Sequence, residues 1–308
     1  MKILANDGID AVGKQMLEAA GIVVDTQKIA QEDLINRLNE YDGITVRSAT
    51  KVRKDLIDAC PNLKIICRGG VGMDNIDVAY ARSKGILVSN TPASSSTAVA
   101  ELVMAHIFTC VRFLHRSNRL FLKSDADLFN QLKKEYGNGV ELYGKTLGIV
   151  GFGRIGQELA RIATGVGMKV LAYDIIAPTN YEGAAEFCSD INQIFSHSDF
   201  ISLHTPAQKD GLPLIGAEQF GRMKQGVGIV NTSRGGIIDE LALLTNLDSN
   251  KVAFAALDVF ENEPLPREAL LNHPKISVSP HIGAATLEAQ ERIGIELAQI
   301  VIDFAGKK

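Results

Sequence analysis

The chain has 308 residues, which is too long for one small core and predicts two domains. Hydrophobic residues make up 46% and charged residues 22%, as in ordinary globular proteins, and a net charge of -4 argues against a nucleic-acid partner. The chain does not start as a signal peptide, no apolar run could cross a bilayer, and four scattered cysteines lack metal or disulfide spacing, so we expect a cytoplasmic protein without a bound metal or a membrane partner.

Short apolar runs alternate with helix-like segments over residues 1–90. The runs are KILA, GIVVD, GITVR and LKIICRG, and amphipathic stretches such as AVGKQMLEAAG and QEDLINRLNEY separate them. A short apolar run suits a buried strand, and apolar residues spaced by three or four suit a helix that covers a sheet. The alternation predicts parallel strands connected by helices, which is an α/β fold.

The rhythm changes near residue 91. A proline and a Ser/Thr cluster suited to capping a helix precede a long helical pattern, NTPASSSTAVAELVMAHIFTCVRFLHRSNRL. We expect this helix to connect two domains. Residues 123–144 are polar and contain glycine, which predicts a loop with short helical pieces.

A second series of strands and helices begins at residue 145. Its apolar runs are KTLGIVGFG, MKVLAYD, DFISLHTP, GVGIVNTS, KVAFAALDVF and KISVSP. A helical pattern, LEAQERIGIELAQIVIDFAG, closes the chain. We expect this last helix to pack on the first domain, which would make that domain discontinuous.

The stretch GIVGFGRIGQELA carries a G-x-G-x-x-G pattern between a strand-like run and a helical pattern, and a second strand ends at Asp174 about twenty residues on. Gly151 allows a tight turn, Gly153 lets the backbone approach a pyrophosphate, and Gly156 lets the helix pack on the strand. Asp174 would bind the adenine ribose hydroxyls and repel a 2′-phosphate. Residues 174–180 contain no arginine to compensate, so we predict NAD rather than NADP. The alternative is a glycine turn in a sheet that binds nothing.

Three charged residues follow predicted strands in the second half, where α/β folds bind ligands: Arg234 in NTSRGG, Glu263 in DVFENEP and His281 in SPHIGA. Oxidation of a hydroxy acid at C2 requires a proton carrier, a cation that grips the carboxylate, and an acid that orients the carrier, and His, Arg and Glu match these roles. Each could instead be an ordinary loop residue, and His204 in LHTP is a rival proton carrier. Their joint position downstream of one dinucleotide motif favours the catalytic interpretation.

The order and spacing of these motifs resemble the D-2-hydroxyacid dehydrogenase family along the whole chain. The resemblance implies a Rossmann NAD-binding domain over residues 98–283. It also implies a flavodoxin-like, discontinuous catalytic domain made of residues 1–97 and 284–308. Family members are usually dimers, so we expect a homodimer whose interface comes from residues 98–144.

The resemblance also implies roles for individual residues. Arg234, Glu263 and His281 are the implied catalytic residues. The implied cofactor contacts, beyond Asp174 and the three glycines of the motif, are Arg154, Ile155, His204, Thr205, Pro206, Thr232, Asp258, Gly283 and Ala284.

Two cations with hydroxyls between them follow a predicted strand in TVRSATKV, namely Arg47 and Lys51, and Arg68 follows the neighbouring strand. A solvated turn is the simple explanation. However, TVRSATKV, CRGGVGMDNID and KGILVSNTPASSSTAVAEL are similar to the phosphoglycerate dehydrogenases of serine biosynthesis, a branch of the family. This similarity implies a phosphorylated 2-hydroxy acid as substrate, bound by Arg47, Ser48, Arg68, Gly69, Gly70, Arg234 and His281.

The expected activity is therefore the NAD-dependent oxidation of D-3-phosphoglycerate to 3-phosphohydroxypyruvate. One alternative is a reductase of glyoxylate or hydroxypyruvate, which Arg47 and Lys51 disfavour. Another is a dehydrogenase of a different phosphorylated hydroxy acid such as erythronate 4-phosphate, and a remote one is an NAD-sensing, corepressor-like scaffold. The chain stops at residue 308, so we expect no C-terminal serine-binding regulatory domain.

Overall fold

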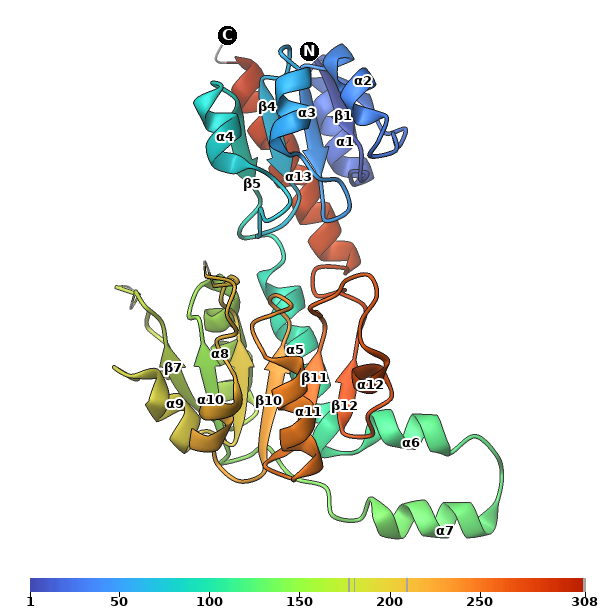
Figure 1. Cartoon of the computed structure of the whole chain (residues 1–308), viewed down its shortest axis with the longest axis vertical. Coiled ribbons are helices and arrows are strands. Elements are labelled where there is room, and N and C mark those ends of the chain that lie inside the picture. The colour runs from blue at the N-terminus through green and yellow to red at the C-terminus, as the bar shows by residue number, and fades with distance from the viewer. Residues whose placement is uncertain (177, 180, 209, 307–308) are drawn as a thin grey trace. The chain divides into compact units, whose positions relative to one another are not determined.

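The computed structural model describes residues 1–176, 178–179, 181–208 and 210–306. The chain divides into two compact units (Figure 1). Unit 1 comprises Met1–Ala98 and Ala284–Lys308, of which the last two residues lie outside the described part, and unit 2 comprises Val99–Gly283. Each unit is an α/β fold around its own parallel sheet, which confirms the predicted fold class.

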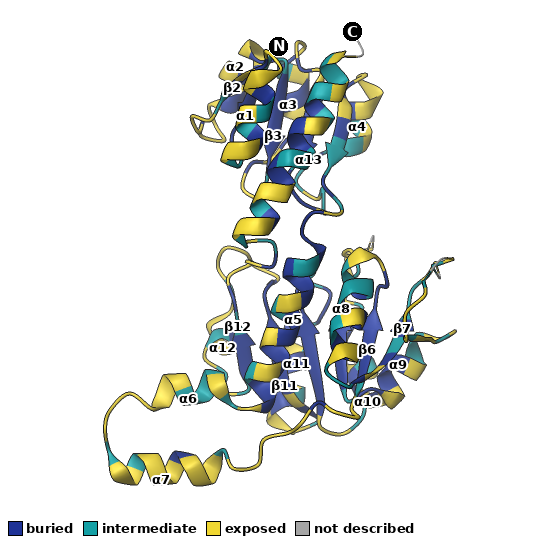
Figure 2. Ribbon diagram, turned by 180° about the vertical axis from the view of Figure 1, so that it is seen from behind, coloured by how far each residue is buried: buried dark blue, intermediate teal, exposed yellow. Residues whose placement is uncertain are grey.

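The described residues of unit 1 form a five-stranded sheet in the order β2-β1-β3-β4-β5, the flavodoxin-like order. The strands are short, and most of their side chains are buried because helices cover both faces of the sheet (Figure 2). Their bounds are β1 Lys2–Ala5, β2 Val23–Asp25, β3 Gly43–Val46, β4 Ile65–Arg68 and β5 Leu87–Asn90.

Helices cover both faces of this sheet. Leu34, Leu56 and Ala81 pack on one face, and Leu17 and Leu297 pack on the other. The helices are α1 Ala11–Ala19, α2 Leu34–Arg37 with the 3-10 turn Leu38–Glu40, α3 Lys54–Ala59, α4 Val78–Ser83 and α13 Leu287–Gly306.

The last helix of the chain packs closely against the first one. A Cβ atom at Gly13 of α1 would lie 2.3 Å from the carbonyl oxygen of Gly294 in α13, so the two backbones approach where neither residue has a side chain. The two segments of unit 1, which lie at opposite ends of the sequence, therefore share one core.

The described residues of unit 2 form a seven-stranded parallel sheet in the order β12-β11-β10-β9-β6-β7-β8. This is the doubly wound Rossmann arrangement. From β6 the chain adds β7 and β8 on one side of the sheet and then crosses over to add β9 to β12 on the other side, so the direction of winding reverses between β6 and β9. The strands are β6 Thr146–Val150, β7 Lys169–Tyr173, β8 Glu186–Phe187, β9 Phe200–Leu203, β10 Val227–Asn231, β11 Val252–Leu257 and β12 Ile276–Val278.

Two helical layers enclose this sheet. The amphipathic α8 packs with the apolar α5 on one face through residues such as Leu159 and Ile107, and α9, α10 and α11 cover the other through residues such as Phe195, Phe220 and Leu243. The helices are α5 Ser96–Val111, α8 Arg154–Gly165, α9 Ile191–His197, α10 Ala217–Arg222, α11 Glu240–Asp248 and α12 Glu268–Leu271.

An arm made of α6, Leu114–Leu120, and α7, Ala126–Glu135, projects from the body of unit 2 (Figure 1). The arm follows α5 through Phe113, which has a φ of 58°, and it carries exposed apolar side chains such as Leu122 and Phe129. Among the described helices, none is by itself long and apolar enough to span a membrane, and only α5 and α6 taken together, bent by 63°, reach that length and composition.

Candidate active site

The glycine-rich turn between β6 and α8 packs against protein backbone at Gly151 and Gly156 and faces empty space at Gly153. Gly151 has a φ of +91°, and a Cβ there would lie 2.5 Å from the carbonyl oxygen of His204. A Cβ at Gly156 would lie 2.4 Å from the carbonyl oxygen of Gly151. In contrast, a Cβ at Gly153 would meet no atom within 4 Å. Gly151 and Gly156 thus have no room for a side chain, and the open space at Gly153 leaves the backbone before α8 accessible to a ligand.

The start of α8 suits an anion. Gly153 is its N-cap residue and provides no side-chain acceptor for the first-turn amides, and Arg154 and Ile155 form the first turn. Amides without an acceptor and the helix dipole together favour a phosphate group at this position. Because α8 begins at the edge where the strand order reverses, the turn lies where doubly wound sheets bind dinucleotides.

Asp174 follows β7 and supports the glycine turn from the neighbouring strand. Its Oδ2 accepts a hydrogen bond from the backbone N–H of Phe152 at 2.6 Å, and its Oδ1 accepts one from the N–H of Ile176 at 3.1 Å. A carboxylate next to the turn fits ribose hydroxyls and disfavours a 2′-phosphate. Residues 177 and 180, which belong to the stretch without arginine near Asp174, lie outside the described residues.

Buried polar atoms without a partner gather at the ends of β9 and β10. They are His204 Nδ1, Thr205 Oγ1 and Thr232 Oγ1, none of which has a hydrogen-bond partner in the described part of the chain. A buried polar atom left unpaired costs about 1–3 kcal/mol, so such atoms in one place indicate a polar ligand. Together with the glycine turn and Asp174, they fit NAD. Pro206 follows them and is exposed.

His204 differs from the other candidate proton carrier in its surroundings. Its Nε2 lies 2.8 Å from Ser202 Oγ, and burial lowers the pKa of His204 to about 4. The ring therefore stays neutral near pH 7 and is poorly suited to hold a proton during turnover. Sequence reasoning could not separate it from His281, because burial depends on the whole fold.

His281 and Glu263 form a hydrogen-bonded pair. Nδ1 of His281 lies 2.7 Å from Oε2 of Glu263, and the other carboxylate oxygen accepts a hydrogen bond from the backbone N–H of Phe260 at 3.1 Å. Both side chains remain partly exposed to solvent, and no described residue hydrogen-bonds to Nε2 of His281. The pair thus presents Nε2 outward, with the carboxylate placed to orient the ring and to stabilise its protonated form.

The backbone of His281 is strained. Its φ of 54° lies in the left-handed region, which non-glycine residues rarely adopt. Its turn is held by Asp258, which is fully buried and whose Oδ1 and Oδ2 accept hydrogen bonds from the N–H groups of Ile282 and Gly283, both at 2.8 Å. In this structure the Asp258 carboxylate therefore faces the loop that carries His281. Strain that the surroundings enforce is typical of functional sites.

Arg234 follows β10 on a loop that is tied to its own strand. The amide of Asn231 donates to the carbonyl oxygen of Arg234 at 2.8 Å, and Nη1 of Arg234 donates to the carbonyl oxygen of Ser233 at 2.6 Å. A Cβ at Gly235 would lie 1.9 Å from the carbonyl oxygen of Phe260, so this loop packs directly on the loop that leads to Glu263. The fold thus brings the Arg234 loop next to the His281–Glu263 pair.

The predicted phosphate loop of unit 1 is fixed by side chains from two other loops, one after β1 and one between β4 and α4. Oδ2 of Asp7 accepts hydrogen bonds from the N–H of Arg47 at 2.7 Å and the N–H of Thr50 at 3.1 Å. The amide of Asn75 donates to the carbonyl oxygens of the same two residues at 2.8 and 2.6 Å. Ser48 is exposed between them. The loop is therefore ordered by its own unit, with its outer side left accessible.

Arg68 reaches the same edge of the sheet from β4. β3 and β4 are paired neighbours, with Val46 opposite Arg68, so Arg68 at the end of β4 and Arg47 just after β3 lie at adjacent strand ends. A Cβ at Gly70, whose φ is +134°, would lie 1.9 Å from Nη1 of Arg68, and a Cβ at Gly69 would lie 3.7 Å from Cγ of Arg47. Gly70 therefore makes room for the Arg68 side chain, whereas the closest neighbour of a Cβ at Gly69 would be Ile293 of α13, at 3.1 Å. Ala284, the last predicted cofactor contact, is partly buried against the core of unit 1.

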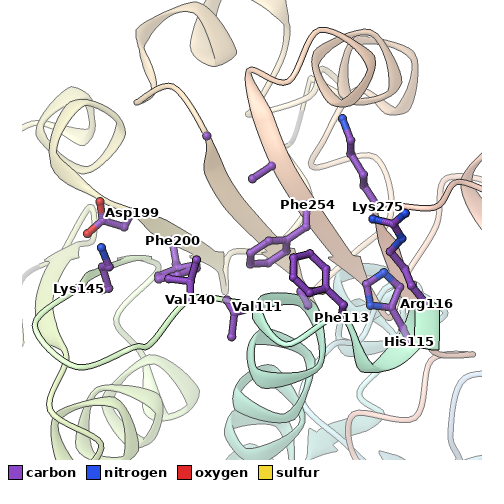
Figure 3. A pocket seen from close by; sticks show the side chains of 13 residues that line it. Val111, Phe113, His115, Arg116, Val140, Lys145, Asp199, Phe200, Phe254 and Lys275 are labelled. Atoms are coloured by element: carbon purple, nitrogen blue, oxygen red, sulfur yellow. The ribbon is translucent and has the colours of Figure 1, made fainter. Parts of the chain in front are cut away.

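A pocket of about 370 Å³ in unit 2 lies away from these residues (Figure 3). Phe113, Phe200 and Phe254 line it, with His115 and Lys275 beside them. Since Phe200 begins β9 and Lys275 immediately precedes β12, this pocket is at the amino ends of the strands. The dinucleotide residues lie at the carboxyl ends, so this pocket is not the cofactor site.

Comparisons with known proteins agree with this geometry. Residues 104–283 match the family described as D-isomer specific 2-hydroxyacid dehydrogenase, NAD binding domain. A hydroxypyruvate reductase from Thermotoga maritima is 43% identical over 309 residues, which cover 99% of this chain and 98% of that protein. A D-3-phosphoglycerate dehydrogenase from Methanocaldococcus jannaschii is 40% identical over 301 residues, which cover 97% of this chain but only 56% of that protein.

A solved structure shows the same fold. The D-lactate dehydrogenase from Aquifex aeolicus, complexed with NAD and lactic acid, has a TM-score of 0.80 and 29% identity, with 100% of this chain and 96% of that chain covered. An NAD-binding family is what the glycine turn and Asp174 indicate, and the two relatives are a reductase and a dehydrogenase. The chain therefore belongs to the D-isomer specific 2-hydroxyacid dehydrogenases, and it is an NAD-dependent oxidoreductase.

Proposed function

We propose that the enzyme oxidises D-3-phosphoglycerate to 3-phosphohydroxypyruvate, the first step of the phosphorylated route to serine. The observation that carries this proposal is the pair of arginines, Arg47 and Arg68, on adjacent strand ends of unit 1 beside two glycines. A phosphate ester offers several acceptor oxygens and up to two negative charges, which suit arginine forks. A substrate without a phosphate offers one anionic group fewer for this cluster to bind.

We base the proposed catalytic roles on the geometry of unit 2. His281 Nε2 takes the proton of the C2 hydroxyl, and the Glu263 carboxylate holds the ring and stabilises the imidazolium that forms. Arg234 binds the substrate carboxylate and polarises the C2 oxygen. NAD, when bound, would supply the acceptor for the hydride of the C2–H bond. The hydroxyl proton would be held by His281, so the hydroxy acid would become the keto acid.

The glycine turn, Asp174, Thr205 and Thr232 are the residues that would hold the cofactor. In this proposal unit 2 is the NAD-binding domain and unit 1 is the substrate domain. Reduction of hydroxypyruvate is the second candidate, because the hydroxypyruvate reductase matches this chain over nearly its full length, whereas the phosphoglycerate dehydrogenase extends well beyond it.

Replacing Arg47 by Ala separates these candidates. We expect KM for D-3-phosphoglycerate to rise about 10- to 100-fold, since a charge-assisted hydrogen bond contributes about 1.5–3 kcal/mol. The dissociation constant for NADH should stay unchanged, because Arg47 belongs to the other unit from the glycine turn. Steady-state kinetics and fluorescence titration with NADH measure the two quantities.

The matched control is Arg37→Ala, which removes one arginine of the same unit from helix α2 instead of a strand end. This variant should keep KM within about twofold, as expected for a surface charge. An unchanged KM in Arg47→Ala would make the loop an ordinary turn. Wild-type enzyme that turns over hydroxypyruvate or glyoxylate strongly and phosphoglycerate not at all would establish the second candidate instead.

We also propose a homodimer formed through the arm of unit 2. Leu122 is 77% exposed and Phe129 is 51% exposed, and apolar side chains this open on one arm are typical of a contact surface. The double variant Leu122→Asp with Phe129→Asp should elute as a monomer in light-scattering chromatography. Leu212→Asp, at a leucine that is 63% exposed outside the arm, should leave the dimer intact. A dimer that survives the arm variant would rule out this interface.

A further inference from the structure

We infer that His106 is a positioning residue that fixes the turn of His281 through a hydrogen-bond chain inside unit 2. His106 lies on α5, far from the site motifs in sequence, and is only 6% exposed. Its ring bridges two serines at the end of β12: Nδ1 lies 2.9 Å from Ser277 Oγ and Nε2 lies 2.9 Å from Ser279 Oγ. Because both ring nitrogens of His106 are hydrogen-bonded, the orientation of the imidazole ring is fixed.

The direction of each hydrogen bond follows by elimination. Ser279 Oγ lies 2.6 Å from Asp258 Oδ1, and a carboxylate that also accepts backbone N–H groups is an acceptor, so Ser279 donates its only proton to it. The Ser279 oxygen must then accept the Nε2 proton of His106, and Nδ1 accepts from Ser277. Burial lowers the pKa of His106, which agrees with a neutral ring of this tautomer.

Asp258 connects the Ser279 hydroxyl, which His106 orients, to the backbone on both sides of His281. Its carboxylate accepts from the N–H groups of Ile282 and Gly283, which follow His281, and from the hydroxyl of Ser279, which precedes it by two residues. The carbonyl of Ser279 also accepts the N–H of His281 at 3.1 Å. The strained φ of His281 is thus enforced by groups that His106 orients. If the serine hydroxyl could turn away, the carboxylate would lose one of the three donors that place it.

Replacing His106 by Phe tests this chain, because Phe occupies a similar volume without a hydrogen-bond donor. This inference rests on the proposed role of His281, and the expected effect is therefore on catalysis. We expect kcat to fall on the order of tenfold, as for a catalytic group moved by a fraction of an ångström, with KM for NAD within about twofold.

Companion variants separate positioning from simple core packing. Ser279→Ala should lower kcat to a similar extent, and the double variant with His106→Phe should be no worse than either single one, since both break the same chain. His106→Gln, which keeps an N–H donor, should recover most of the lost kcat. Ser277→Ala removes only the other partner of the ring and should change kcat by less than about twofold.

Two results would overturn the inference. One is a normal kcat in His106→Phe or Ser279→Ala, even where the melting temperature falls. The other is a multiplicative loss in the double variant. Ser279→Ala keeps the test decisive should His106→Phe not fold. His281→Gln separates the role of His281 from the role of His106. An active His281→Gln enzyme would contradict the proposed mechanism. An inactive His281→Gln enzyme together with a fully active His106→Phe enzyme would contradict only the role of His106.

Discussion

Replacement of His281 by Gln is expected to lower kcat by about 10³-fold while NADH binding stays within about twofold. General acid–base catalysis by a positioned side chain contributes about 10²–10⁴-fold, and His281 is the histidine whose Nε2 faces solvent while its Nδ1 is held by a carboxylate 2.7 Å away. Gln retains a polar group of similar reach but cannot hold a proton. Rapid-mixing kinetics of NADH formation, together with NADH titration, measure the two effects.

Glu263→Gln is the matched comparison. It keeps a hydrogen-bond acceptor near Nδ1 but removes the charge that stabilises the imidazolium, so we expect a smaller loss of kcat, on the order of 10²-fold. His204→Asn tests the rival. Because burial lowers the pKa of His204 to about 4, this change should alter cofactor affinity more than kcat. If kcat of His204→Asn is lower than kcat of His281→Gln, His204 is the proton carrier and His281 is not.

The fold was predictable because its signals are local. A parallel strand covered on both sides appears as a short apolar run, and a covering helix appears as a period of three to four, so residues 1–90 and the series from residue 145 both display the βαβ alternation. The doubly wound order of unit 2 and the flavodoxin-like order of unit 1 confirm the predicted class. The glycine motif was equally readable, since its three positions depend on backbone geometry within one turn.

The parts that the sequence did not reveal depend on contacts between distant residues. The bonds from His106 to Ser277 and Ser279 span 171 and 173 positions, and no motif marks a histidine in the middle of an apolar helix. The support that Asp7 gives to the Arg47 loop spans 40 positions. A serine two residues before His281 was visible in SPHIGA, but only the packing of α5 against β12 shows what it does.

The second large effect is expected at Arg234. Replacing it by Lys keeps the charge but removes the planar fork that grips a carboxylate through two parallel hydrogen bonds. We expect kcat/KM for the hydroxy acid to fall by about 10²–10³-fold, since two charge-assisted hydrogen bonds contribute about 1.5–3 kcal/mol each and Lys replaces only part of them. The loss should appear in both KM and kcat, because in the proposed mechanism Arg234 holds the ground-state carboxylate and also polarises the C2 oxygen as it becomes a carbonyl.

Ser233→Ala controls for the loop itself. It removes the hydroxyl that donates to Asn231 Oδ1 at 2.8 Å while leaving the guanidinium intact, so kcat/KM should change by less than about tenfold. Steady-state kinetics on wild type and both variants, with NADH affinity measured in parallel, separates loss of the Arg234 contact with the substrate carboxylate from displacement of the loop that carries Arg234. If Arg234→Lys keeps wild-type kcat/KM, a point charge is sufficient at this position and the bidentate role is wrong. If both variants lose activity equally, Arg234 acts through the geometry of its loop and not through its own contact with the substrate.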